Sequence, residues 1–349
     1  MDHRAPSKLI SDPNPVAAYL NGKLPGEWDR LSVSQLVGGQ SNPTFLLTAG
    51  AHRYVLRTRP PGSLLRSAHA IDREYRVLNA LRNTGVPVPY SHLYCDDGDI
   101  LGTDFYVMDY VPGRVFRNPL LPELSPSERS AVYDSMNATI ANLHSADAAA
   151  LGLADFGRPG NYYARQIDRW TQQYRATEID RIPSMECLIE WLPHNIPPSD
   201  RAGLVHGDFR LENLIFHPTE PRVVAVLDWE LSTLGDPLGD LAYNCLPWRL
   251  PPQAFGGLAG VDLHRSGVPG EQAYLSLYCR RSGLHEVASW PFYVGFALFR
   301  LAAILQGVLN RALAGNASSP DAEQRGRLAP LCADAGWRTV ARADLNAAG

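Results

Sequence analysis

The stretch from Leu204 to Asp240 most constrains what this chain can fold into. One short apolar run ends in His-Gly-Asp at residues 206–208, with Asn213 five residues after the Asp, and a second run ends in Asp228. Two strand-like runs would therefore deliver an acid, an amide and another acid into loops. Such oxygen ligands suit Mg²⁺, which binds through few carboxylates plus phosphate oxygens. Phosphoryl transfer needs such a metal site and one further acid that orients a hydroxyl, a task open to Asp208.

Each of these side chains alone would indicate little, because an Asp or Asn in a loop is usually a turn or capping residue. The ordered combination is more specific. It reads H-G-D-x4-N, followed by an apolar strand and then D-W-E. We therefore interpret the combination as a phosphoryl-transfer site and treat isolated turn residues as the alternative.

The same order occurs in protein kinases, which carry H-R-D-x4-N and then D-F-G. Here Gly207 replaces the Arg, and Trp229-Glu230 replaces Phe-Gly. With these departures the chain resembles the aminoglycoside phosphotransferase-like family of small-molecule kinases. The segments HGDFRLEN, VLDWE, GDPLGDLAY, YVLRTRPPGSLLRSAHAIDREYRVL and FYVMDYVPG resemble the branch that is associated with acyl-CoA dehydrogenases. Without the Arg we expect no activation-loop switch of the protein-kinase type.

Composition and charge limit the partners. The 349 residues carry a formal net charge of −4, which gives no general attraction to nucleic acid. The start has no apolar signal core, so we expect a cytoplasmic protein. The long apolar segment 291–313 is interrupted by Arg300, Gln306, Asn310 and Arg311, so we expect a buried core helix and no membrane contact. Nothing in the sequence indicates an oligomeric state.

The pattern of elements predicts an α+β fold with two lobes. Five strand-like runs and one main helix occupy the first part of the chain, and mostly helical patterns follow Gly113. Together with the resemblance, this predicts a bilobal protein-kinase-like fold with a five-stranded antiparallel N-lobe and a mostly helical C-lobe. The predicted lobes are residues 1–111, which bind the nucleotide, and residues 112–349, which carry catalysis and substrate binding.

A cation is expected on the third strand to grip the nucleotide phosphates. Kinases usually use Lys there, and the segment 53–59 offers Arg57 first and Arg59 second. Period-two alternation puts both on one face. The helix predicted for 67–84 carries Glu74 on its apolar stripe, where an unpaired carboxylate is costly. We therefore expect Glu74 to pair with the strand cation; a solvated Arg and an edge Glu are the alternatives.

Two further segments are expected to contact the nucleotide. Ser41 and Asn42 lie in a Gly-containing loop that can cover phosphates, although most such loops are plain hairpins. A strand ending in Pro112-Gly113 suits a hinge between the lobes. There the backbone groups of Asp109 and Val111 would bind adenine, with Met108 behind the ring; an ordinary buried strand end is the alternative.

The resemblance also implies roles for the acids. Asp208 would be the catalytic base, and Asn213 with Asp228 would hold Mg²⁺ on the phosphates of ATP. Asp240 would tie the catalytic loop together and do no chemistry. Asp236 and Glu230 would support the residues that contact the metal and the substrate, without contacting these themselves.

The expected activity is ATP- and Mg²⁺-dependent phosphorylation of a small-molecule hydroxyl. The family branch suggests a hydroxyacyl thioester of coenzyme A, with a weak physical hint from the arginines near the C-terminus. Two alternatives stay open. One is a nucleotide-binding pseudokinase, suggested by Arg in place of Lys; the other is an antibiotic kinase, which would want a strongly acidic acceptor cleft.

Overall fold

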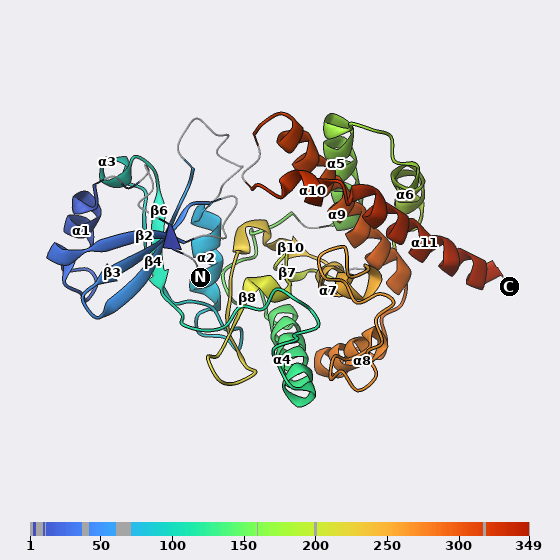
Figure 1. Ribbon diagram of the computed structural model, residues 1–349, viewed down its shortest axis with the longest axis horizontal. Helices are drawn as coiled ribbons and strands as arrows, with labels where there is room; N and C mark the ends of the chain where they lie inside the picture. Colours follow the sequence, from blue (N-terminus) through green and yellow to red (C-terminus); the bar gives the residue numbers. More distant parts are fainter. Residues whose placement is uncertain are drawn as a thin grey trace. The chain divides into compact units, whose positions relative to one another are not determined.

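The computed structural model describes residues 3–4, 10, 12–36, 42–60, 71–158, 160–198, 201–316 and 319–348 (Figure 1). The chain forms two compact units. Unit 1 comprises Met1–Arg114 and Val224–Glu230, and unit 2 comprises Val115–Val223 and Leu231–Gly349. The expected division at residues 111 and 112 placed 224–230 in the second lobe, whereas the structure groups this segment with unit 1. The Val226 N–H donates to the Pro87 carbonyl oxygen at 2.9 Å, which ties the segment to unit 1.

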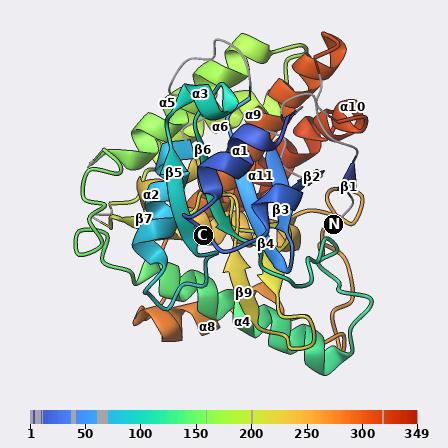
Figure 2. The ribbon, with the colours of Figure 1, turned by 90° about the vertical axis from the view of Figure 1, so that its left-hand side faces the viewer.

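Unit 1 is built on an antiparallel sheet with the strand order β1-β2-β3-β4-β6-β5. Five longer strands confirm the predicted five-stranded sheet, and a two-residue strand, β1, extends its edge (Figure 2). The strands are β1 (His3–Arg4), β2 (Ser32–Leu36), β3 (Thr44–Ala49), β4 (His52–Thr58), β5 (Ser91–Cys95) and β6 (Phe105–Asp109). The short helices of this unit are α1 (Asn14–Leu20) and α3 (Gly98–Leu101).

The two faces of this sheet have different chemistry because side chains alternate along each strand. One face is apolar, and its buried members pack with Val16 and Leu20 of α1 in one hydrophobic cluster: Phe45, Leu47, Tyr54, Leu56, Phe105 and Val107. The register pairs Arg57 of β4 with Tyr106 of β6. Both of these side chains contact Glu74 of α2 (Ile71–Leu81), so the second face carries the polar groups of the site.

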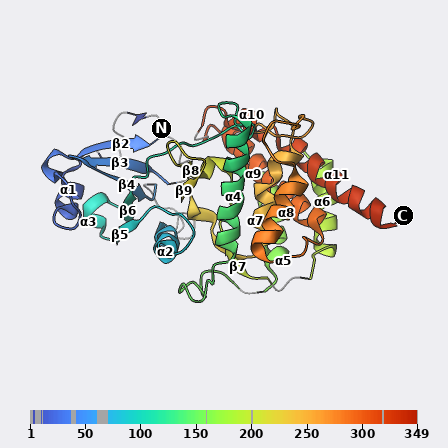
Figure 3. The same ribbon diagram turned by 90° about the horizontal axis from the view of Figure 1, so that it is seen from below.

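Unit 2 is mostly helical. Its long helix α9 packs against α5, α6, α7, α10 and α11, and α4 packs against α8 (Figure 3). The helices are α4 (Pro126–His144), α5 (Tyr162–Thr177), α6 (Pro183–His194), α7 (Pro237–Asn244), α8 (Glu271–Ser282), α9 (Trp290–Leu313), α10 (Ala322–Gly326) and α11 (Ala329–Ala348).

Helix α9 is the core helix that the sequence predicted. By length and hydropathy it could cross a membrane, but 72% of its most apolar window is buried inside the protein. Its polar residues Arg300 and Gln306 are themselves buried, at 8% and 3% exposure. A buried arginine needs partners, and the partners of Arg300 belong to the site described below.

Short strands position the loops of unit 2. Strand β7 (Gly203–Val205) pairs antiparallel with β10 (Thr233–Gly235), with Val205 opposite Thr233. All three residues of β7 are buried, so the chain enters the His206–Asp208 segment from a fixed point. Strand β8 (Leu214–Phe216) follows the 3-10 turn Leu211–Asn213. Strand β9 (Val223–Val226), which lies in unit 1 from Val224 onward, leads toward Asp228 of the same unit.

Candidate active site

Arg57 is the centre of a buried ionic cluster in unit 1. Its Nε lies 2.8 Å from Glu74 Oε2, and its Nη2 lies 2.7 Å from Asp228 Oδ1 and 3.8 Å from Glu230 Oε2. Burial opposes the charge, but the carboxylates of Glu74 and Asp228, together with Tyr106, raise the pKa of Arg57 above its usual value. A planar guanidinium can meet two carboxylates through different nitrogens, whereas an ammonium is a single point charge. Arginine at this position therefore joins α2 and the Asp228 segment at once.

Glu74 is held from three sides. Besides Arg57, the Asn42 amide donates to Oε1 at 2.7 Å and the Tyr106 hydroxyl donates to Oε2 at 3.1 Å. Burial raises the pKa of Glu74, and Arg57 together with the two hydrogen bonds partly offsets that rise. The predicted pairing of Glu74 with the strand cation is thus present in the structure.

The Asn42 side chain is buried, with 0% exposure, and donates to Glu74, so it positions that carboxylate. The covering of phosphates by this loop stays a prediction. Ser41, predicted beside Asn42, lies outside the described residues. The second candidate cation is separated from the cluster as well, because β4 ends at Thr58 and Arg59 pairs with Asp104.

The end of β6 presents the residues expected near adenine. Met108 is buried at 8% exposure. The Asp109 N–H donates to the Tyr90 carbonyl at 2.9 Å, so this N–H is already used within unit 1. The Asp109 carboxylate lies 2.7 Å from His92 Nε2. Val111 is half-buried just before Pro112.

In unit 2 the loop after β7 presents Asp208. The Asn213 amide donates to the Asp208 carboxylate and to its backbone carbonyl, both at 2.8 Å. Arg210 Nε lies 3.3 Å from the same carboxylate, whose side chain is 16% exposed. The Tyr243 hydroxyl also bonds to it: burial, then the charge of Asp208, raise the pKa of Tyr243. One carboxylate is therefore fixed in direction and still reachable from solvent.

Asp240 fixes the backbone of this loop through hydrogen bonds. Its two oxygens accept from the backbone N–H groups of His206 at 2.8 Å and Gly207 at 2.9 Å. His144 Nε2 lies 3.2 Å from the carboxylate, and the other His144 nitrogen meets the Tyr278 hydroxyl at 2.8 Å. Burial alone would raise the pKa of Asp240, but the hydrogen bond and charge of His144 and the contacts with His206 lower it. This geometry agrees with the structural role predicted for Asp240.

Gly207 explains the missing arginine of the kinase-like motif. Its φ is +83°, and an added Cβ would lie 2.6 Å from the Leu231 carbonyl oxygen. A side chain at this position would therefore strain the backbone and collide with a group that cannot easily move.

Gly207→Ala should consequently lower the free energy of unfolding by more than the left-handed backbone alone costs, which is roughly 1–2 kcal/mol. The matched control is Gly283→Ala, at a φ of +67° with nothing within 4 Å of the added Cβ. Urea unfolding of both variants measures the difference. Equal losses would show that the Leu231 contact has no effect.

Arg300 is a site residue that sequence reasoning used only as a helix interruption. Its Nη2 donates to the Gly207 carbonyl at 2.5 Å. Its guanidinium carbon lies 5.0 Å from the Tyr243 ring centre and 5.4 Å from that of Trp170. The available signal was a charge within an otherwise apolar helix, because such a charge must be buried against partners.

The residues predicted for Mg²⁺ have suitable donor atoms. Asn213 donates its two hydrogen bonds to Asp208 through Nδ2, and its Oδ1 is an oxygen that can bind a metal ion. The Asp228 side chain is 33% exposed, and one of its oxygens meets Arg57. Asp228 has a φ of +68°, a conformation that is rare outside glycine and concentrates at functional sites. Asn213 lies in unit 2 and Asp228 in unit 1.

A chain with a carboxylate oriented by an asparagine in one unit, and a strand cation paired with a helix glutamate in the other, has the parts of a kinase-like phosphotransferase. The chain belongs to the phosphotransferase enzyme family, whose family model matches residues 32–275. It is an enzyme of the small-molecule phosphotransferase type.

Curated relatives carry acyl-CoA dehydrogenase names. Human acyl-CoA dehydrogenase family member 11 is 46% identical over 316 residues, which is 89% of this chain and 40% of that protein. Mouse acyl-CoA dehydrogenase family member 10 is 48% identical over 309 residues, or 88% of this chain and 29% of that protein. The chain thus spans less than half the length of these relatives.

Solved structures agree on the fold. A protein of Ralstonia eutropha JMP134, assigned as an aminoglycoside phosphotransferase, is 46% identical with a TM-score of 0.86, covering 95% of this chain and 98% of its own. Aminoglycoside phosphotransferase APH(4)-Ia, in a ternary complex with ADP and hygromycin B, is 16% identical with a TM-score of 0.59 over 92% of this chain and 97% of its own. The second likeness concerns the fold alone and supports the predicted kinase-like α+β architecture.

Proposed function

We propose that this enzyme transfers the γ-phosphoryl group of ATP, with Mg²⁺, to a hydroxyl of a small molecule, and that its acceptor is a hydroxyacyl thioester of coenzyme A. The observation that carries the proposal is the position of the Asp208 carboxylate. It accepts one hydrogen bond from the Asn213 amide, which also donates to the Asp208 backbone carbonyl, and it is still partly exposed. A fixed, reachable carboxylate can orient an acceptor hydroxyl.

Asp208 takes the hydroxyl proton as the acceptor oxygen forms its bond to the γ-phosphorus. The bond from that phosphorus to the oxygen bridging it to the β-phosphate breaks, and ADP leaves. Arg57 holds the phosphates and is itself held by Glu74. Asn213 and Asp228 would bind Mg²⁺, whose charge neutralises the phosphate oxygens.

The ATP part of the proposal is supported by the related structure with bound ADP. The thioester part is supported by the names of the relatives, in which a region like this chain belongs to acyl-CoA dehydrogenase family members. A hydroxyl is a poor leaving group, and phosphorylation would convert it into a phosphate ester that can be eliminated. This would allow the product to enter reactions that act on unsaturated acyl thioesters.

A direct test measures ADP release and product mass with ATP, Mg²⁺ and one acceptor at a time. The acceptors are a 4-hydroxyacyl-CoA, the free hydroxy acid, choline, homoserine and kanamycin. The highest kcat/KM is expected for the thioester. Equal or better phosphorylation of another acceptor would remove the thioester assignment, and kanamycin as the best acceptor would favour an antibiotic kinase.

Nucleotide binding without any phosphorylated product would instead favour the pseudokinase alternative. The geometry favours an active enzyme, because the replacement of Lys by Arg leaves the pairing with Glu74 in place. The departure that prompted the alternative therefore has a structural explanation.

A further inference from the structure

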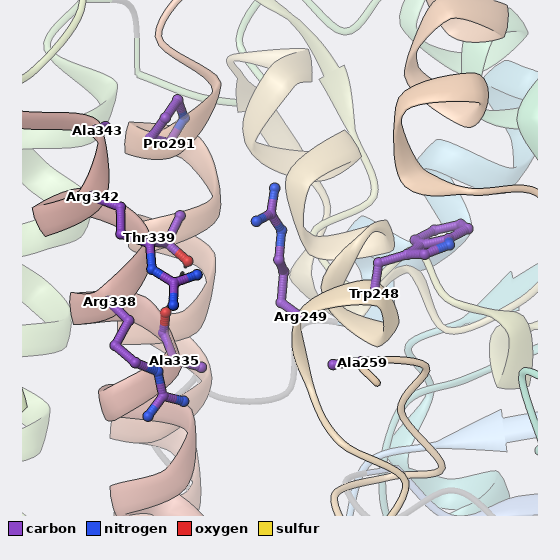
Figure 4. A pocket seen from close by; sticks show the side chains of 9 residues that line it. All are labelled: Trp248, Arg249, Ala259, Pro291, Ala335, Arg338, Thr339, Arg342 and Ala343. Carbon is purple, nitrogen blue, oxygen red and sulfur yellow. Dashed lines mark hydrogen bonds between the residues drawn. The ribbon is translucent and has the colours of Figure 1, made fainter. Parts of the chain in front are cut away.

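Unit 2 contains a cleft whose walls carry three arginines. The cleft has a volume of about 660 Å³, within the range of small-molecule sites. Arg338 and Arg342 project from α11 on one wall, and Trp248 and Arg249 belong to the opposite wall (Figure 4). The remaining lining residues carry no charge: Ala259, Pro291, Ala335, Thr339 and Ala343. All the charged residues that line the cleft are arginines, although the chain as a whole has a net charge of −4.

The two arginines of α11 are available for a ligand. Both are exposed, and neither forms an ion pair with any carboxylate that the structure describes. Four residues apart on a helix, they lie on the same face, about 6 Å apart along the axis. Two guanidinium forks at this spacing offer more donors than a single carboxylate can accept.

On the opposite wall, Arg249 is held in place by Glu271. Arg249 reaches Glu271 through Nε at 3.0 Å and through Nη2 at 2.8 Å, and the Trp290 indole donates to the same carboxylate at 3.0 Å. These contacts use two of the five N–H groups of Arg249, and three are left. A donor that is already fixed loses little conformational entropy when it binds a ligand.

We propose that this cleft binds a ligand with two or more phosphate groups, gripped by Arg338 and Arg342 and contacted by Arg249 from the facing wall. Arginine favours phosphate because its planar fork donates two parallel hydrogen bonds. The phosphates can come from free pyrophosphate or from the adenosine 3′,5′-bisphosphate portion of a coenzyme A acceptor. Only the second source rests on the proposed function.

The test is isothermal titration calorimetry with EDTA and no ATP, so that binding is measured without metal or turnover. Pyrophosphate and adenosine 3′,5′-bisphosphate are titrated separately into the whole chain and into the Arg338→Gln/Arg342→Gln variant. At least a tenfold weaker Kd is expected in the variant for one or both probes, and the probe affected identifies the source. Both sites are exposed and Gln is a good helix former, so the fold should be kept.

The control variant is Arg117→Gln/Arg280→Gln, which removes the same charge from two exposed arginines outside the cleft. It should bind both probes as the unchanged chain does. The proposal is overturned if the α11 variant binds both probes with unchanged affinity, or if the control weakens binding equally. If probe binding depends on the α11 arginines but no acceptor is phosphorylated, the phosphate-binding cleft is supported and the proposed function is contradicted.

Discussion

Asp208→Asn is expected to lower kcat by about 10²–10⁴-fold, the usual effect of removing a general base. The asparagine keeps the size of the side chain and can still accept a hydrogen bond from Asn213. It cannot take the proton of the acceptor hydroxyl. The apparent affinity for ATP should change little, because the arginine assigned to the phosphates is Arg57. Steady-state ADP release with the best acceptor of the panel measures both quantities.

The matched control for this prediction is Asp168→Asn. Asp168 is exposed on α5, and its carboxylate accepts from Gln172 on the same helix. The control should keep kcat, and both variants should unfold near the temperature of the unchanged protein. If Asp208→Asn retained near-full kcat, another group would have to be the base, and the assignment of Asp208 would be wrong.

Asp240→Asn is expected to lower the free energy of unfolding by roughly 2–5 kcal/mol, because buried groups left without a partner cost about 1–3 kcal/mol each. Asp240 accepts from two backbone N–H groups, those of His206 and Gly207. The single oxygen of Asn can serve only one of them, and its NH₂ group would face the other donor. Since the same loop carries Asp208, kcat should fall as well, even where the variant remains folded.

The acid side of the stability profile gives a second measurement on Asp240. Its contacts lower the pKa in the folded protein, so its contribution is present above the ordinary Asp value of about 3.9 and is lost as pH falls through the folded pKa. The stability difference between the unchanged protein and Asp240→Asn should therefore be full near pH 7 and shrink below about pH 4. A difference independent of pH would contradict the assigned contacts. Asp262→Asn, at an exposed turn, should show neither effect.

Much of the fold followed from local patterns. Strand-like runs predicted the five longer strands of unit 1, and an interrupted apolar run predicted the buried helix α9. Glu74 was predicted to need a cation because it lies on the apolar stripe of its helix, and it is 1% exposed beside Arg57. Such inferences succeed because the spacing of apolar residues along the sequence indicates which face of a helix or strand is buried.

Other features required the tertiary structure. Arg57 and Arg59 are two residues apart in the sequence, which does not say which acid each one pairs with. In the folded protein Arg57 pairs with Glu74 of α2, and Arg59 pairs with Asp104. The sequence placed Asn42 in a loop predicted to cover phosphates, and only the fold shows that its side chain donates to Glu74.

By itself, the sequence determined the chemistry available to this protein: an acid, an amide and an acid in a fixed order, with a strand cation and a helix glutamate. The tertiary structure decided how that chemistry is held. It showed that Gly207 is needed because the Leu231 carbonyl leaves no room for a side chain, and that Arg300 reaches the same loop. The physical reason is that such contacts join residues distant in sequence, Gly207 to Leu231 and Gly207 to Arg300, and no local period records which distant groups will meet.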